Sequence, residues 1–238
     1  MTDHLNSAHD DRLDPGMAAQ AERRRDAESG GAEQVGWKAG LGTTTWRERF
    51  GLTAPLVGFL LDTSRDRPGA HVEVGTWISP YGEAEIAMRV GDDVPGDATP
   101  GQALAAVDAI APAIELIDLD PLPTDPVEAL AGNIFHRRWI TGTFDSTRAG
   151  GDVSGLVGHI TVMDETLAPV TELEIATGPA GEVLAEVARI AARHGRGLRA
   201  GDIVLLGSVV PPVAIAPYGT MHYVLGDAPA LEVTFTGR

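Results

Sequence analysis

Residues 82–90 have the sequence GEAEIAMRV, in which apolar and acidic side chains alternate. This alternation predicts a strand, because side chains two residues apart on a strand point to the same face. One face carries the apolar residues Ala84, Ile86, Met88 and Val90. The other face carries Glu83 and Glu85, whose Cα atoms should lie about 6.6 Å apart. Two carboxylates are therefore expected side by side on a stiff element.

A third acid, Glu115, lies in the apolar stretch APAIELI at residues 111–117. An ionised carboxylate in such a stretch is costly to bury unless a cation or a hydrogen-bond donor meets it. Three carboxylates without cysteine suit a hard divalent cation, Mg²⁺ or Mn²⁺. The alternatives are a solvated strand face for Glu83 and Glu85, and a core acid satisfied by arginine or backbone donors for Glu115. Taken together, the three acids favour a metal site.

The composition excludes several classes of protein. The chain has 238 residues, of which 43% are hydrophobic, so it can fill the core of one β-rich domain. Its formal net charge of −16 argues against nucleic acid or an anionic membrane as a partner. There is no cysteine, no apolar run of the ~20 residues that cross a bilayer, and no signal-like pattern in residues 1–12. We expect a soluble, cytoplasmic protein.

Along the chain, we expect a disordered tail over residues 1–13 and a single catalytic domain over 14–238, with a helical arm at 14–34. The patterns predict helices at 15–29, 44–50, 99–109, 125–131 and 181–194. They predict strands at 35–38, 57–61, 72–78, 82–90, 112–119, 203–206 and 231–235. Many short strands, few helices, and turns rich in the 29 glycines and 16 prolines favour a β-rich α+β fold.

Lys38 lies in the glycine-rich stretch GWKAGLG at residues 36–42. A lysine at a strand end often extends its charged group to solvent along an apolar surface. The glycines offer a second interpretation, because they let the backbone approach a ligand closely and a lysine there can neutralise an anion. The stretch lacks the third glycine of a dinucleotide-binding fingerprint.

Two further segments carry polar groups that suit an anionic ligand. In NIFHRRW at residues 133–139, His136 is either a loop histidine beside two solvated arginines or a catalytic group, and Arg137 and Arg138 could bind a substrate carboxylate. Gly207 and Ser208 end an apolar strand, either as a plain turn or as backbone N–H and hydroxyl donors for an anion. No Gly-x-Ser-x-Gly motif is present, which disfavours serine-hydrolase chemistry.

Several of these pieces form an ordered set over about residues 35–236. They are GWKAG at 36–40, PLVG at 55–58, EAEIA at 83–87, PAIELID at 112–118, Asn133, GDIVLLGS at 201–208 and the closing strand. The set resembles the fumarylacetoacetate hydrolase superfamily, in particular its 2-keto-4-pentenoate hydratase and 4-oxalocrotonate decarboxylase branch. The resemblance implies a mixed β-roll with a few flanking helices, and a homo-oligomer.

By this resemblance, the metal ligands are Glu83, Glu85 and Glu115, and Lys38 lies beside the substrate. We expect Lys38, His136 and Ser208 to be catalytic. We expect the substrate to be bound by Lys38, Asn133, Arg137, Gly207 and Ser208.

The implied activity is that of a Mg²⁺- or Mn²⁺-dependent hydro-lyase on small 2-oxo acids in aromatic catabolism. The metal would stabilise an enolate while water adds to a 2-hydroxy-2,4-dienoate. A decarboxylase or an acylpyruvate C–C hydrolase could use the same metal site. A further alternative is a weakly catalytic subunit that pairs with an active homologue.

Overall fold

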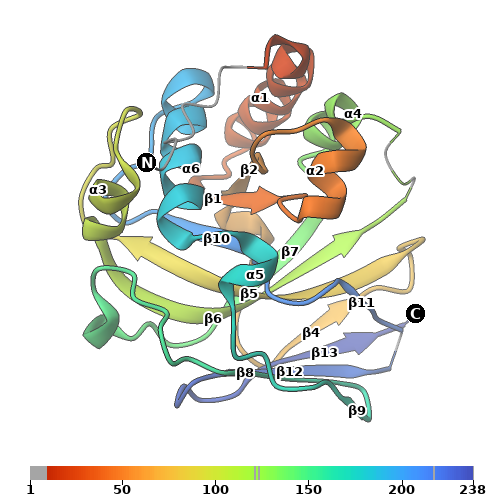
Figure 1. Cartoon of the computed structure of the whole chain (residues 1–238). Coiled ribbons are helices and arrows are strands. Elements are labelled where there is room, and N and C mark those ends of the chain that lie inside the picture. Colours follow the sequence, from red (N-terminus) through yellow and green to blue (C-terminus); the bar gives the residue numbers. More distant parts are fainter. Residues whose placement is uncertain (1–9, 121, 123, 217, 238) are drawn as a thin grey trace.

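Two β-sheets form the frame of the protein in the computed structural model, which describes residues 10–120, 122, 124–216 and 218–237 (Figure 1). The larger sheet has the strand order β2-β1-β10-β5-β6-β7-β3, and β11 pairs with β5. The smaller sheet has the order β4-β13-β12-β8-β9 and lies below the larger one in Figure 1. Both sheets mix parallel and antiparallel pairs, which confirms the expected β-rich α+β fold.

The strands of the larger sheet are β1 (Gln34–Gly40), β2 (Leu56–Leu61), β3 (Arg65–Asp66), β5 (Pro80–Val90), β6 (Val107–Asp118), β7 (His136–Thr141), β10 (Ile203–Ser208) and β11 (Val213–Ala214). Those of the smaller sheet are β4 (Ala70–Glu73), β8 (Gly158–Val162), β9 (Glu165–Thr166), β12 (Thr220–Leu225) and β13 (Leu231–Thr236). The α-helices are α1 (Asp14–Ser29), α2 (Thr44–Phe50), α3 (Pro100–Ala105), α4 (Pro126–Ala131), α5 (Glu174–Thr177) and α6 (Ala180–His194). Single 3₁₀ turns occur at Asp11–Leu13, Asp62–Ser64 and Ser146–Arg148.

The two faces of the long antiparallel pair β5–β6 have different surroundings. Ala84, Ile86 and Met88 of β5 belong to the main hydrophobic core, together with residues of the smaller sheet such as Tyr223 and Phe235. This confirms the predicted alternation of β5, because Glu83 and Glu85 are left on the opposite face.

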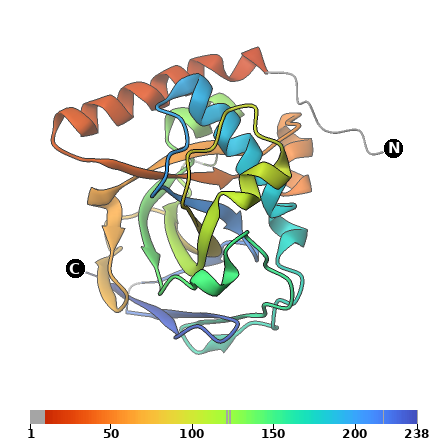
Figure 2. The ribbon, with the colours of Figure 1, turned by 90° about the vertical axis from the view of Figure 1, so that its left-hand side faces the viewer.

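That opposite face is the inner face of the larger sheet, which curls on itself (Figure 2). It holds a second, smaller hydrophobic cluster, made of Leu60, Ala87, Ala111, Ala113, Trp139, Ile203 and Leu205. Three of these residues are alanines on the central strands β5 and β6. Their small side chains let larger residues such as Trp139 and Leu205 pack inside the curl.

Most helices lie above the larger sheet in Figure 1, on the side of the molecule away from the smaller sheet, and α6 shares the main hydrophobic core with both sheets (Figures 1 and 2). Helix α1 packs on α4, and α6 packs on β1, β10 and α3. Thr99 and Gln102 form a capping box at the start of α3, and the left-handed Gly51 ends α2. Among the described helices, none is both long and apolar enough to cross a bilayer.

Three predicted elements differ by several residues from those observed. The helix predicted to reach residue 109 ends at Ala105 and the strand predicted at 112–119 begins at Val107, because Ala109 pairs with Arg89 in the sheet and strand pairing outweighs its helix propensity. The strand predicted at 72–78 is observed at Ala70–Glu73, since the chain turns after Val74, whose carbonyl oxygen accepts a hydrogen bond from the Trp77 amide. Of the expected tail, residues 1–9 lie outside the described residues, and Asp11–Leu13 forms a turn that leads into α1.

Close packing of β1 on β10 predicts that Gly36→Ala destabilises the protein. A Cβ atom at Gly36 would lie 2.0 Å from the Ile203 carbonyl oxygen, so the parallel strands would have to separate. We expect a loss of about 3 kcal/mol in the free energy of unfolding, at the upper end of typical overpacking costs. Urea unfolding measures it. Gly101→Ala is the matched control, since nothing lies within 4 Å of its new Cβ atom, and equal losses in both variants would contradict the prediction.

Candidate active site

Three carboxylates converge on the inner face of the curled sheet. Glu83 of β5 lies directly opposite Glu115 of β6 in the antiparallel register, and Glu85 follows two residues along on the same face. One ligand atom from each acid lies within 4.8 Å of the others. Like charges directly opposite each other destabilise a sheet. This arrangement therefore calls for a cation.

The hydrogen bonds of the three acids leave oxygen atoms for such a cation. Oε1 of Glu115 accepts from the Lys38 ammonium and lies 2.7 Å from Nδ1 of His136. Oε2 of Glu115 is buried and has no hydrogen-bond partner within the described part of the chain. Oε2 of Glu85 accepts a hydrogen bond of 2.9 Å from the Gly207 amide. An all-carboxylate donor set with an unpaired buried oxygen fits Mg²⁺ or Mn²⁺.

Lys38, the only lysine in the chain, is buried beside this group. Burial lowers the pKa of its ammonium, but the charges of Glu115, Glu83 and Glu85 outweigh burial, and the net shift is upward. For Glu115, burial raises the pKa, but the Lys38 charge and the contacts with His136 outweigh it and lower the pKa. The pair is therefore ionised, and Lys38 is the fixed positive charge of the site. Its Nζ also donates to the Ile134 carbonyl oxygen at 3.3 Å.

Behind Glu115, His136 and Ser64 extend the hydrogen-bonded chain. The Ser64 hydroxyl lies 3.0 Å from Nε2 of His136, whose Nδ1 faces Glu115. Burial lowers the pKa of His136, which favours the neutral ring. A neutral ring donates through Nδ1 to Glu115, and its Nε2 then shares the single Ser64 hydroxyl proton with the Leu61 carbonyl oxygen, which lies 3.0 Å from the same hydroxyl. Ser64 has no sequence signal of its own, because only the fold brings it from the turn after β2 to His136.

The other two acids are strongly affected by their surroundings. Burial raises the pKa of Glu83 to about 8, the Glu115 charge adds to this shift, and Lys38 opposes it. Burial and the charges of Glu115 and Glu83 also raise the pKa of Glu85. Lys38 therefore compensates one of the three carboxylates, and the raised pKa values of the other two favour their protonated forms unless a further cation replaces the protons.

A left-handed turn after α4 shapes one wall of the site. Asn133, Ile134 and Phe135 have φ values of 54°, 53° and 63°. The Asn133 side chain holds this turn by accepting from the Phe59 amide and donating to the Phe59 carbonyl oxygen, both at 3.0 Å. Asn133 is buried and bonded to the backbone of β2, so it positions Ile134 and Phe135.

Gly58 makes room for this arrangement. A Cβ atom there would lie 2.7 Å from Oδ1 of Asn133 and 3.0 Å from Cγ of Lys38. The glycine of the PLVG segment thus lets the lysine stem and the asparagine amide lie against the same strand.

Gly207 and Ser208 lie where the pairing of β10 with β5 is irregular. Gly207 has a φ of 101°, which favours glycine, and its amide donates to Glu85. The Ser208 hydroxyl makes a long hydrogen bond of 3.4 Å to the Ala84 carbonyl oxygen. Both residues line the cavity described next. The Gly207 amide is committed to Glu85, whereas the Ser208 hydroxyl makes only this long hydrogen bond.

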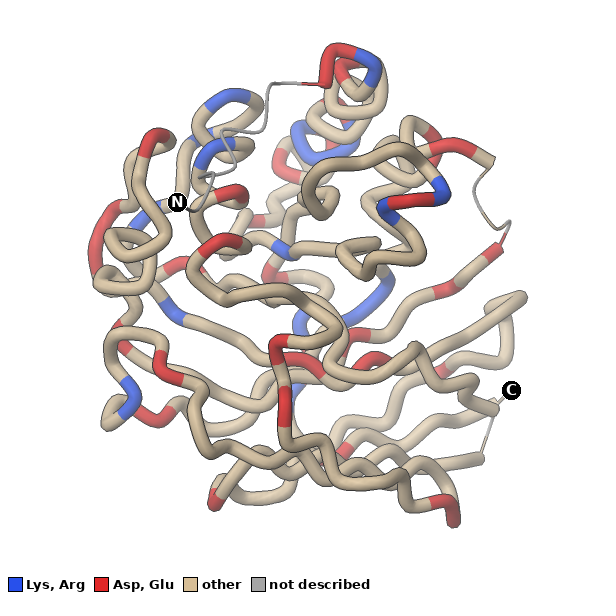
Figure 3. The backbone as a smooth tube through the Cα atoms, in the orientation of Figure 1, with Lys and Arg blue, Asp and Glu red and all other residues tan. Residues whose placement is uncertain are grey.

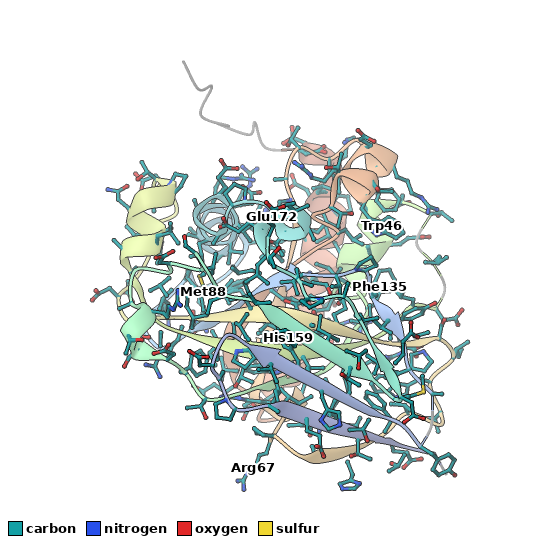
Figure 4. The ribbon with its side chains drawn as sticks, turned by 60° about the horizontal axis from the view of Figure 1, so that its bottom comes forward. Trp46, Arg67, Met88, Phe135, His159 and Glu172 are labelled. Atoms are coloured by element: carbon teal, nitrogen blue, oxygen red, sulfur yellow. The ribbon has the colours of Figure 1, made fainter. Side chains whose placement is uncertain are left out.

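A cavity of about 330 Å³ opens above the acids. Its polar floor includes Lys38, Glu83, Glu85 and Ser208. Its walls are largely apolar and include Leu41, Trp46, Ile117, Ile134, Phe135 and Val210. Figure 4 shows Trp46 and Phe135 on the same side of the molecule, away from Arg67 of the loop before β4. The space suits a small organic acid with its charged end on the floor.

The remaining residues predicted for the site lie outside this cavity lining. Arg137 forms an ion pair of 3.1 Å with Asp118, and Arg138 pairs with Asp66. His136 lies behind Glu115, and Asn133 lies behind the wall. Sequence patterns did not point to Thr45 and Trp46 of α2, which line the cavity, because α2 has no motif beyond its caps.

Comparisons with known proteins identify relatives and structural neighbours of this chain. No family model matches the chain. A 4-oxalocrotonate decarboxylase of Pseudomonas putida is 32% identical over 206 residues, covering 83% of this chain and 76% of that protein. A TodF product hydratase of Pseudomonas putida (strain F1) is 30% identical over 217 residues, or 86% and 77% of the two chains. The structure of 4-oxalocrotonate decarboxylase from Pseudomonas putida G7, complexed with magnesium and adipate, matches with a TM-score of 0.84 and 26% identity. The match covers 92% of this chain and 84% of that protein.

The curled sheet has the fold that the resemblance to the fumarylacetoacetate hydrolase superfamily implied, and a fumarylpyruvate hydrolase of Pseudomonas aeruginosa shares this fold with a TM-score of 0.68. The chain belongs to the family of 2-keto-4-pentenoate hydratases and 4-oxalocrotonate decarboxylases.

The raised pKa of Glu83 predicts how pH affects the metal-free protein. Its carboxyl holds a proton up to about pH 8 in the folded state but releases it near 4.5 when unfolded. The folded state therefore binds more protons in this window, and stability falls as pH rises through it. Mg²⁺ should restore stability, and more strongly at pH 8 than at pH 6, because it replaces protons.

Thermal unfolding with and without Mg²⁺ tests this. At about a hundred times its Kd, Mg²⁺ adds about 2.7 kcal/mol, or roughly 5–10 °C in Tm for a chain of this size. Glu83→Gln is the control and should show a smaller Mg²⁺ effect and a flatter pH profile. Identical profiles for the variant and the wild type would contradict the assignment.

Proposed function

We propose that this protein is a Mg²⁺- or Mn²⁺-dependent lyase acting on small 2-oxo acids, and that it hydrates a 2-hydroxy-2,4-dienoate. The observation that carries the proposal is the arrangement of Glu83, Glu85 and Lys38 on the floor of a small, largely apolar cavity, with the buried Glu115 in contact with Lys38 and close to the other two acids. The family contains hydratases and decarboxylases, and both reactions need negative charge stabilised on the keto oxygen of a 2-oxo acid.

Glu83, Glu85 and Glu115 would hold the metal through their inward oxygens. When bound, the dication supplies Lewis-acid stabilisation of charge that develops on the substrate's keto oxygen. The hydrogen bonds from Gly207 to Glu85, and from Lys38 and His136 to Glu115, fix the carboxylates that form this site. Such preorganisation lowers the reorganisation needed during the reaction.

Lys38 has the clearest role for a residue that contacts substrate. Its ammonium has three N–H groups, and its protein acceptors are Glu115 and the Ile134 carbonyl oxygen. Since Lys38 lines the cavity, one N–H remains for a substrate oxygen. The Ser208 hydroxyl, held only weakly by Ala84, is placed to exchange a hydrogen bond with the substrate. His136 and Asn133 act indirectly, by orienting Glu115 and the 133–135 turn.

A decarboxylase on the same site is the second candidate. It is favoured by the 32% identity to a 4-oxalocrotonate decarboxylase, compared with 30% to the hydratase. The same charge-stabilising site would accept the electron pair released with CO₂. An acylpyruvate hydrolase would need a positioned water in addition.

We also propose a single catalytic domain over residues 14–238 that works as a cytoplasmic homo-oligomer in aromatic catabolism. The domain assignment is supported by α1, whose residues pack on α4 as part of the main core. The absence of cysteine is compatible with a reducing compartment.

Product analysis tests the function. The purified protein, stripped of metal and reloaded with Mg²⁺, is given 2-hydroxypenta-2,4-dienoate, 4-oxalocrotonate or an acylpyruvate in separate NMR assays. We expect 4-hydroxy-2-oxopentanoate from the dienoate, only with metal present. CO₂ release from 4-oxalocrotonate as the fastest reaction would establish the decarboxylase instead. No turnover of any of the three would refute the lyase assignment and favour a partner subunit.

We predict that replacing Lys38 reduces turnover but leaves the protein folded. Lys38→Ala should reduce kcat by on the order of a hundredfold, the usual scale for one charge-stabilising donor. Steady-state kinetics measures this, and a retained Mg²⁺-induced rise in Tm shows that the variant still folds around the metal. Near-normal kcat would remove Lys38 from the mechanism.

A further inference from the structure

Helix α1 carries one fully buried polar side chain, that of Gln20. The helix is otherwise rich in charged residues, and Figure 3 shows acidic and basic positions along it. Its buried residues are Gly16, Met17 and Gln20. A side-chain amide is costly to bury unless its polar atoms are hydrogen-bonded. Gln20 therefore needs partners in the body of the protein.

The Gln20 amide joins β2 to the end of α4. Its Nε2 donates to the Val57 carbonyl oxygen of β2 and to the Leu130 carbonyl oxygen of α4, both at 3.2 Å. Because both partners are carbonyl oxygens, the amide must present its NH₂ group to them. Gly16 lets α1 come this close, since a Cβ atom there would lie 2.7 Å from the Val127 carbonyl oxygen. Helix α1 thus holds α4 and β2 together.

Both carbonyl groups belong to segments that lead into the cavity wall. Val57 lies next to Gly58, the residue that makes room for the lysine stem. The Leu130 carbonyl oxygen also accepts from the Asn133 amide at 2.9 Å. The same oxygen therefore fixes both α1 and the first residue of the left-handed turn. Gln20 itself is not part of the cavity lining, so any effect on the site passes through these segments.

The turn has to be held, because its backbone conformation costs free energy. Asn133, Ile134 and Phe135 all have positive φ values. Asparagine tolerates such values, but a β-branched isoleucine and a bulky phenylalanine rarely adopt them. Conformations of this kind persist only where the surrounding structure fixes them. The Asn133 side chain holds the turn against β2, and the Gln20 amide holds the helix end from which the turn departs.

We propose that Gln20 is a positioning residue for the reaction at this site. By fixing the end of α4 against β2, it holds the turn that supplies the wall residues Ile134 and Phe135. The same turn supplies the carbonyl oxygen that accepts from Lys38. This inference rests on the proposed function, since it assumes that turnover takes place in the cavity beside Lys38. It makes the N-terminal helix part of the catalytic geometry.

Kinetics of two Gln20 variants test this role in the Mg²⁺-loaded protein. Gln20→Met keeps the length of the side chain but removes both donors, and Gln20→Asn keeps the amide but withdraws it from the two carbonyl oxygens. We expect kcat/KM to fall about tenfold in each variant, because small displacements of positioning groups are costly. The substrate is whichever of 2-hydroxypenta-2,4-dienoate and 4-oxalocrotonate the wild type converts. The Kd for Mg²⁺ should stay unchanged, since the three acids lie on β5 and β6.

Met17→Ala is the matched control on the same buried side of α1. Met17 is 4% exposed and Gln20 is 3% exposed, and Met17 belongs to the main hydrophobic core. Its truncation should lower Tm while leaving the Gln20 hydrogen bonds in place, and kcat/KM should stay near the wild-type value. Equal losses of kcat/KM in Met17→Ala and the Gln20 variants would overturn the positioning role, because α1 would then act through stability alone. Wild-type kcat/KM in both Gln20 variants would overturn it as well.

Hydrogen exchange gives a readout that does not need turnover. The Asn133 and Ile134 amides donate to carbonyl oxygens of α4. In Gln20→Met, their exchange relative to that of the β5 and β6 amides should be about tenfold faster than in the wild type, whereas Met17→Ala should leave this ratio unchanged. An unchanged ratio in Gln20→Met would overturn the hold of Gln20 on the turn. A wild type that converts neither substrate would overturn the proposed function, and the catalytic part of this inference with it.

Discussion

The contact between the Lys38 ammonium and Glu115 allows three acids to share one small space. Without it, Glu115 would be a buried charge directly opposite Glu83 on the neighbouring strand, with Glu85 two residues away. Lys38 compensates one carboxylate and holds it in its ionised form. The remaining two carboxyls have raised pKa values and so tend to keep their protons. A dication bound between them would replace those protons.

Much of the surrounding structure supports this contact. Gly58 leaves space for the lysine stem, and Asn133 holds the turn whose carbonyl oxygen accepts from Lys38. His136 contacts the same oxygen of Glu115 from the other side. Alanines at 87, 111 and 113 form a packed cluster with larger apolar residues on the same face as the acids. The site is thus built mainly on strands, which hold side chains more rigidly than loops do.

The sequence predicted those parts of the site that depend on local periodicity. Alternation in residues 82–90 placed Glu83 and Glu85 on one face, and an acid in an apolar run marked Glu115. Strand register, which joins Glu83 to Glu115, is a long-range property that a single strand does not encode. For the same reason the sequence did not reveal the contact between Ser64 and His136. It also could not show that Arg137 forms an ion pair with Asp118, and Arg137 was expected to bind substrate instead. The end of α3 was misplaced because pairing with β5 outweighs local helix preference.

The placement of the single lysine has a consequence for the chemistry of the protein surface. Because that side chain is buried, the folded chain presents no ε-amine to solvent, and every other basic side chain apart from histidine is an arginine. Acetylation, ubiquitin transfer and amine-reactive labels act on ε-amines, and in the native state this chain exposes none to them. Labelling of the ε-amine would accordingly report that the interior has opened.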